Sequence, residues 1–236
     1  LRVFPSVTMF DIISQFNLSP TTFGQFSGAY YIGYALMHIP IGLLLDRYGP
    51  KHIIPLFIVL TVIGQFLLLF KGLGALAIAG RFFVGAGSSA AILGLFRVIR
   101  MEFKEEIFTR MLSLGVTLGL LGAIYGGAPL GNLKNACGFQ NTVMILIILG
   151  LLLALLTFML FPAQKHNLAE KDSITAHLRE VFGNKTVLIL CVFSGLMVGP
   201  LEGFADVWSV IFLKKVHVLS EDMANKLPSL IFIGMC

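Results

Sequence analysis

Charged residues are scarce in this sequence. Only 12% of its 236 residues are Asp, Glu, Lys or Arg, and 57% are hydrophobic, whereas ordinary soluble domains carry roughly 25% charged residues. So few ionic groups could not cover the surface of a soluble protein of this length, and we therefore expect a lipid bilayer to surround the chain. The net charge of +5 then reflects membrane topology, and we expect no nucleic-acid partner.

Several signatures of catalysis and metal binding are also missing. The three cysteines, Cys137, Cys191 and Cys236, lie far apart without the spacing of metal ligands. The sequence contains no H-E-x-x-H, no serine elbow and no G-x-x-x-x-G-K-[ST] phosphate loop. We therefore predict that the protein is not an enzyme and that it uses no metal or cofactor.

Long apolar runs are abundant instead. A helix needs about 20 apolar residues to cross a hydrocarbon core of about 30 Å, and the runs of about this length are 23–45, 53–70, 75–96, 111–131, 142–163 and 186–213. Only Arg81, Glu202 and Asp206 place a charge inside them. Continuous runs favour helices over the alternating strands of a barrel, so the sequence predicts an all-α integral membrane protein.

The polar segments divide this predicted protein into two helical bundles. Residues 1–162 form the first bundle, whose first helix reads as truncated, 163–185 a cytoplasmic connector, and 186–236 the beginning of a second bundle. Lys and Arg number ten in the loops on the connector's side and five on the opposite side, which places the connector and the loop at 46–52 in the cytoplasm. Two bundles joined in this way are typical of secondary transporters.

A charged cluster ends the second helix, in the stretch GLLLDRYGPKH at 42–52. A carboxylate at a helix C-terminus faces the negative end of the macrodipole, which costs about 0.3–1 kcal/mol. We therefore expect Asp46 to have a positive partner outside its own helix. Arg97, Arg100 and the N-terminus of a neighbouring helix are the candidates.

The spacing within this stretch resembles a known family. G-x-L-x-D-R-x-G-x-K resembles the loop signature between helices two and three of the major facilitator superfamily, with Pro50 as a departure where the pattern usually has a basic residue. The preceding residues, SGAYYIGYALMHIPIG, look like the second helix of bacterial members. GRFFVGAGSSA resembles the R-x-x-x-G pattern of the fourth helix through Arg81 and Gly85. The matching loop residues are Gly42, Leu44, Asp46, Arg47, Gly49 and Lys51.

The resemblance implies a twelve-helix carrier, of which this chain covers about helices 1–8. It implies a proton-driven or gradient-driven secondary active transporter that moves a small polar solute by alternating access, and we predict protons as the coupling ion, in symport or antiport. Gly42, Asp46, Arg47, Gly49 and Lys51 would form a cytoplasmic latch. We expect a monomer in the bacterial inner membrane. A transporter-like sensor that binds solute without moving it remains the alternative.

Polar residues inside the spans mark the candidate binding site. An arginine within a span costs about 2.5–3.5 kcal/mol on insertion scales, so Arg81 should face a polar interior, unless it extends to a membrane interface. If Arg2 also faces inward, an anionic or zwitterionic solute is favoured. The full set of predicted binding residues is Arg2, Tyr31, Tyr34, Arg81, Tyr125 and Glu202.

Glu202 and Asp206 are the acidic residues inside a span. They lie four residues apart on one helical face, where two ionised carboxylates repel each other. This property suits proton uptake and release, and both residues are therefore predicted to couple transport to protons. The alternatives are that Asp206 lies at the outer interface and that Glu202 forms a structural pair with Arg81 or Arg2.

Overall fold

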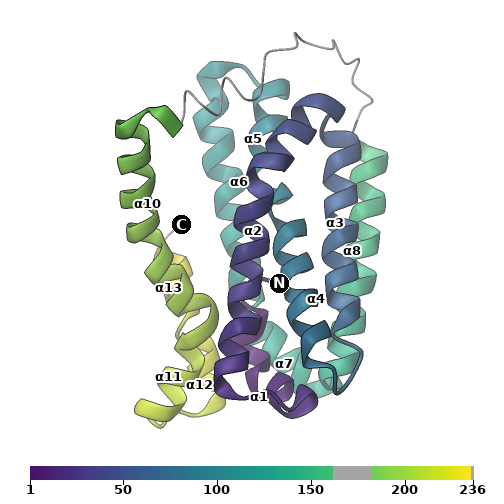
Figure 1. Cartoon of the computed structure of the whole chain (residues 1–236), viewed down its shortest axis with the longest axis vertical. Coiled ribbons are helices and arrows are strands. Elements are labelled where there is room, and N and C mark those ends of the chain that lie inside the picture. The colour runs from purple at the N-terminus through teal and green to yellow at the C-terminus, as the bar shows by residue number, and fades with distance from the viewer. Residues whose placement is uncertain (162–181, 235–236) are drawn as a thin grey trace.

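A computed structural model describes residues 1–161 and 182–234, and within these ranges its regular elements are all helices (Figure 1). The predicted connector at 163–185 therefore falls almost entirely outside the described residues. The helices are α1 (Phe4–Phe16), α2 (Pro20–Tyr48), α3 (Pro50–Leu67), α4 (Gly74–Ser88), α5 (Ala90–Glu102), α6 (Glu105–Tyr125), α7 (Ala128–Cys137), α8 (Phe139–Leu160), α10 (Lys185–Gly203), the π-helical turn η1 (Phe204–Trp208), α11 (Ser209–Val216), α12 (Glu221–Lys226) and α13 (Ser229–Gly234).

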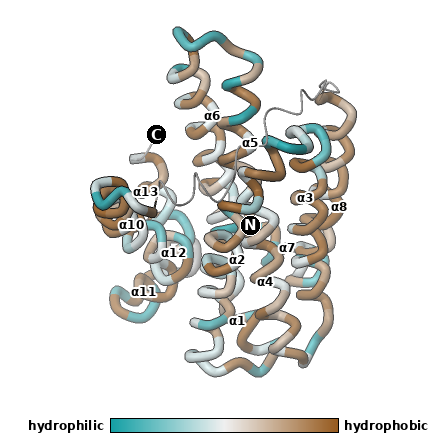
Figure 2. Tube along the Cα trace, turned by 45° about the horizontal axis from the view of Figure 1, so that its top comes forward, coloured by the Kyte–Doolittle hydropathy of each residue, from teal (hydrophilic) through white to brown (hydrophobic). Residues whose placement is uncertain are grey.

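The described residues contain six helical stretches long and apolar enough to cross a membrane. Each of them contains or closely matches one of the six predicted spans, which confirms those predictions. Hydrophilic residues gather at helix ends, most clearly where α5 turns into α6 (Figure 2). The stretches are Pro20–Tyr48, Pro50–Leu67, Gly74–Glu102, Glu105–Cys137, Phe139–Leu160 and Lys185–Val216.

Local sequence sets both ends of α2. Ser19 precedes the helix, and its Oγ accepts a hydrogen bond from the Thr22 backbone N–H at 3.1 Å, which satisfies one free donor of the first turn. At the other end, Gly49 has φ 75°, a conformation that costs glycine little. Pro50 then begins α3 with a fixed φ suited to a first helical position. The chain thus reverses direction with only Gly49 between the two helices.

Helix α4 packs against its neighbours with backbone in direct contact. A Cβ at Gly85 would meet the carbonyl oxygen of Tyr30 in α2, and a Cβ at Gly33 would meet that of Phe82 in α4. On the α3 side, Gly64 and Gly80 approach each other in the same way. Small residues allow this close approach in membranes. The contact places Arg81 of α4 directly beside α2.

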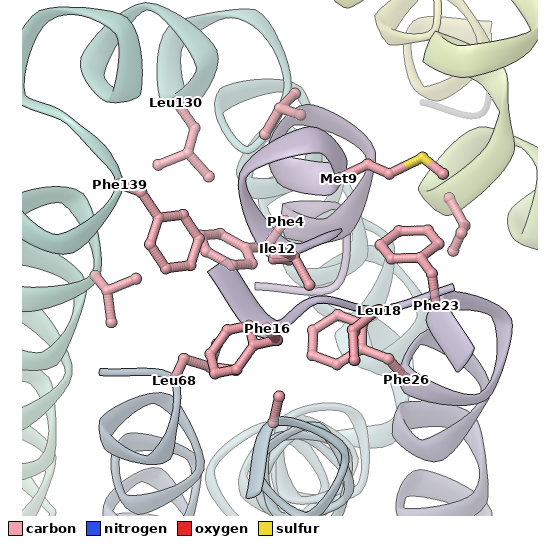
Figure 3. Packing of buried hydrophobic residues seen from close by; sticks show 14 of the residues in the cluster. Phe4, Met9, Ile12, Phe16, Leu18, Phe23, Phe26, Leu68, Leu130 and Phe139 are labelled. Carbon is pink, nitrogen blue, oxygen red and sulfur yellow. The ribbon is translucent and has the colours of Figure 1, made fainter. Parts of the chain in front are cut away.

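Aromatic and aliphatic side chains around α1 form the largest hydrophobic cluster (Figure 3). The rings of Phe4 and Phe139 lie 5.9 Å apart, as do those of Phe23 and Phe26. Figure 3 shows rings converging on α1 from α2 and α8, and Leu68 from the turn after α3. The cluster fixes α1 between the other helices and thereby fixes the position of Arg2, which lies just before it.

The chain after the connector lies along one edge of the molecule (Figure 1). Helix α1 contacts η1 and α11, while α12 contacts α7 and α13 contacts α6. Pro200 lies inside α10, shortly before η1. A π-helical turn contains one more residue than an α-turn, and such turns are frequent at functional sites. In this chain the turn contains Asp206.

Candidate functional site

Arg2 joins the two carboxylates predicted to handle protons. Its Nη1 lies 3.0 Å from Oε1 of Glu202, and its Nε lies 2.9 Å from Oδ2 of Asp206. The i, i+4 spacing of the two acids brings both within reach of one guanidinium. The predicted alternative, a pair between Glu202 and Arg2, is therefore present, and the same arginine also pairs with Asp206.

Asp206 lies in the interior, although one alternative placed it at the outer interface. Its side chain is fully buried, and Oδ2 also accepts a hydrogen bond from the Tyr31 hydroxyl at 3.0 Å. Its other oxygen, Oδ1, has no hydrogen-bond partner among the described residues. A buried carboxylate oxygen without a donor costs free energy. Oδ1 is therefore an open acceptor in this site.

Arg81 is also in the interior and does not extend to an interface. Its side chain is fully buried, and its guanidinium lies 4.7 Å from the Tyr30 ring centroid and 5.5 Å from that of Phe26. Nη1 donates to the carbonyl of Leu1 at 3.1 Å, and Nη2 donates to that of Arg2 at 3.4 Å. Arg81 therefore holds the backbone of Arg2, while Arg2 holds the two acids.

Arg81 and Ser27 each leave one polar atom available. Arg81 Nε and Ser27 Oγ are buried without a hydrogen-bond partner in the described part of the chain. Ser27 lies one helical turn before Tyr30 and Tyr31. Buried polar groups are usually satisfied, so the open Arg81 Nε beside Arg2 indicates a place where a polar ligand or water can bind, and Ser27 Oγ adds a second open group on α2.

Aromatic side chains continue from this site along α2. The Tyr30 ring packs edge-on against Tyr31 at 5.2 Å and stacks on Tyr34 at 6.0 Å. The Tyr34 ring contacts His38 at 4.3 Å, and His38 Nδ1 lies 2.8 Å from the Tyr34 carbonyl oxygen. Tyr34 thus extends the site toward the end of α2 that carries Asp46.

The structure leaves the predicted binding residue Tyr125 exposed and adds Tyr30 to the buried group. Tyr125 is the last residue of α6 and is 69% exposed, and its neighbours Ile124 and Gly126 lie against Val3, the residue after Arg2. Tyr30 belongs to the site through its burial and its contact with Arg81, and the buried Ser27 lies one turn before it on α2; neither is among the predicted binding residues. A signal for Tyr30 is present in the sequence, because a buried arginine in a span needs a polar or π-electron partner.

A separate ion pair connects the ends of α2 and α5. Asp46 Oδ1 lies 3.1 Å from Arg97 Nη1, which confirms Arg97 as one of the expected partners. The two side chains are 64% and 36% exposed, and such a pair adds at most about 1 kcal/mol to stability. At 1.5 Å per residue, Asp46 lies roughly 22 Å along α2 from Tyr31, so this pair and the buried site are distinct.

Comparison with known proteins decides the family. The sequence profile of the Major Facilitator Superfamily matches residues 3–236. The chain belongs to this superfamily. As a member of the Major Facilitator Superfamily, it has the expected all-helical fold of a multi-pass membrane protein, and the buried Arg2 group lies where α1 meets the helical stretch Lys185–Val216.

Two further proteins are similar to this chain, one in sequence and one in fold. The Nitrite extrusion protein of Bacillus subtilis (strain 168) is 25% identical over 179 residues, which cover 72% of this chain and 42% of that protein. A bacterial homolog of the human lysosomal transporter Spinster, crystallised in an inward-facing and occupied conformation, matches with a TM-score of 0.75 at 21% identity. That match covers 99% of this chain and 55% of the other. The chain thus spans about half the length of these relatives.

Proposed function

We propose that the protein is a proton-coupled secondary transporter of a small anionic or zwitterionic solute. One observation carries the proposal: Arg2, at the start of α1, is bound at once to Glu202 of α10 and Asp206 of η1. These elements belong to the two predicted bundles, 1–162 and 186–236. Alternating access requires contacts between bundles that form and break, and a charge pair that a proton can neutralise is such a contact.

Charge balance links the proton to the solute. Arg2 and Arg81 supply two positive charges, and Glu202 and Asp206 supply two negative ones. A proton on Asp206 removes one negative charge and leaves the buried group with an excess positive charge, which is costly away from water. Binding of one solute anion restores neutrality. Proton and anion therefore bind together most favourably.

The released donors then face the solute. When Asp206 is protonated, Arg2 Nε and the Tyr31 hydroxyl no longer bond an ionised carboxylate, while Arg2 Nη1 keeps its pair with Glu202. Both can donate to an anion, together with Arg81 Nε and, further along α2, the Tyr34 hydroxyl. Bidentate donation is the reason that arginine recognises planar anions such as carboxylates. The name of the nitrite-extruding relative, which refers to a small anion, agrees with this solute class.

At the cytoplasmic end, the latch motif stabilises one of the two states of the alternating-access cycle. Asp46 pairs with Arg97, Gly49 allows the tight reversal between α2 and α3, and Arg47 and Lys51 keep the loop outside the bilayer. A Cβ at Gly42, one turn before Asp46, would meet no described atom within 4 Å, which leaves room for a helix to approach. The transporter works as a monomer in the bacterial inner membrane.

Counterflow in proteoliposomes tests transport itself. The full-length protein is reconstituted into vesicles preloaded with unlabelled nitrite or, in parallel, with a neutral amino acid, and uptake of the same labelled solute is followed. A transporter accumulates label transiently above equilibrium. Saturable binding to the purified protein without any counterflow would instead identify a sensor, and flux without saturation would identify a channel.

A further inference from the structure

A cavity of about 560 Å³ opens where α2 turns into α3. Its wall is mainly aliphatic and aromatic, and basic side chains stand at its edge. This is the end of the bundle that the distribution of Lys and Arg places in the cytoplasm. The lining residues are Leu44, Tyr48, Gly49, Pro50, Lys51, His52, Ile53 and Leu56.

The charge around this cavity is positive and is not compensated by the nearest acid. Asp46 pairs with Arg97 of α5, and it points away from the cavity, because residues two positions apart on a helix differ by about 200° in direction. The Arg47 guanidinium lies 5.4 Å over the Tyr48 ring, and the Lys51 ammonium lies 5.7 Å from the Phe158 ring. Neither cation forms an ion pair with a described residue.

Helix α3 adds to this positive character. The helix begins at Pro50, so the backbone N–H groups of Lys51 and His52 have no hydrogen-bond acceptor within the helix. These groups and the positive end of the helix dipole favour an anion at this position. The apolar side chains of Leu44, Ile53 and Leu56 continue from there toward the hydrophobic interior.

The cavity lies on the side of the molecule away from the second predicted bundle. Among described helices, α3 packs mainly against α4 and α8. Figures 1 and 2 both place α3 and α8 at one edge and α10 at the opposite edge. The surface at the cavity is therefore turned toward lipid.

We propose that this cavity binds an anionic phospholipid of the cytoplasmic leaflet. The phosphate group would contact Lys51, Arg47 and the first turn of α3, and an acyl chain would lie against Leu44 and Leu56. Basic pockets between transmembrane helices on the cytoplasmic side suit anionic head groups, and each basic residue near such a surface contributes about fivefold in affinity. This proposal does not depend on the solute or on proton coupling.

Quenching by brominated lipids tests the site in the full-length protein. Trp208 is replaced by Phe, which removes the only tryptophan of this chain; any further tryptophan elsewhere in the full protein is replaced likewise. A reporter is then introduced as Tyr48→Trp at the cavity. The matched control reporter is Ile63→Trp, an exposed position further along α3. Each protein is reconstituted in phosphatidylcholine with increasing fractions of brominated phosphatidylglycerol or, separately, of brominated phosphatidylcholine with the same acyl chains.

From the quenching curves, we expect brominated phosphatidylglycerol to bind beside position 48 at least fivefold more tightly than brominated phosphatidylcholine. We expect no such preference beside position 63. The combined substitutions Arg47→Gln and Lys51→Gln should abolish the preference, whereas Lys104→Gln, an exposed cation on the same side, should preserve it. Equal quenching by both lipids at position 48, or an equal preference at 63, would overturn the proposal. The proposal would also be overturned if both lipids quenched the reporter at position 63 and neither quenched the reporter at position 48. That result would show that another part of the protein fills the cavity.

Discussion

Arg2 and Asp206 come from opposite ends of the chain, yet Nε of one lies 2.9 Å from Oδ2 of the other. The carboxylate is fully buried and the arginine side chain is 29% exposed. Arg81 holds the Arg2 backbone from α4, and Tyr31 holds the carboxylate from α2. The start of α1, helices α2 and α4, and η1 therefore meet in one charged group.

Removing only Arg2 should destabilise the protein more than removing the pair. Arg2→Met leaves Asp206 buried without its cation, and breaking a buried pair in this way costs about 3–5 kcal/mol. Adding Asp206→Asn should recover part of that loss, with a coupling energy of about 1–3 kcal/mol. Thermal unfolding of the purified single and double variants measures the cycle. Additive losses would show that the pair is not coupled.

Gly85→Ala should destabilise the contact between α2 and α4. Its Cβ would meet the Tyr30 carbonyl, and overpacking of this kind costs about 1–3 kcal/mol. Gly28→Ala is the matched control, because a Cβ there meets no described atom within 4 Å and alanine favours a helix. We expect the melting temperature to fall for Gly85→Ala and to stay equal or rise for Gly28→Ala. Equal melting temperatures for the two variants would contradict this packing.

Arg81→Lys should weaken solute binding although it keeps the positive charge. A lysine ammonium cannot reproduce the planar guanidinium that bonds the carbonyls of Leu1 and Arg2 and faces the Tyr30 ring. Arg2 would then lose its position, and we expect the solute dissociation constant to rise about tenfold, the equivalent of one hydrogen bond to a charged group. Titration of the purified variant measures this constant. An unchanged constant would show that Arg81 does not position the site.

Asp46→Asn should slow transport with little effect on folding. The pair with Arg97 is largely exposed, so its loss should change stability by less than about 1 kcal/mol. The loss of this pair should instead change the rate at which the two states of the alternating-access cycle exchange. Counterflow rates, compared at equal amounts of inserted protein, measure it. A variant that transports at the normal rate would remove the latch role from Asp46.

Much of this arrangement follows from the sequence, because a bilayer makes few structures possible. The six spans are evident from length and apolar composition. The pair of Asp46 with Arg97 follows from the unfavourable helix end, and the common face of Glu202 and Asp206 follows from their spacing. Each of these conclusions depends on a single helix or on a single charge near a helix end, and none of them depends on how the helices pack.

The remaining features depend on how helices pack, which spacing does not reveal. The residues of η1 carry no pattern that distinguishes a π turn from an α-turn. The sequence predicts that Arg81 binds solute directly, but two of its nitrogen atoms bond backbone carbonyls, and backbone acceptors leave no trace in a sequence. Tyr125 is exposed at the end of α6, between two residues that lie against Val3, and the spacing of residues does not reveal this proximity to Arg2.

Proton movement by the Asp206→Asn variant tests the central claim most directly. The full-length protein is reconstituted with a pH-sensitive dye inside the vesicles, and both proton influx and solute exchange are recorded with a transported anion. Asp11→Asn is the matched control, since Asp11 pairs with Lys134 outside the buried site. We predict that Asp206→Asn exchanges solute but moves no protons, while Asp11→Asn does both. Proton influx by Asp206→Asn at the normal ratio to solute would contradict the account.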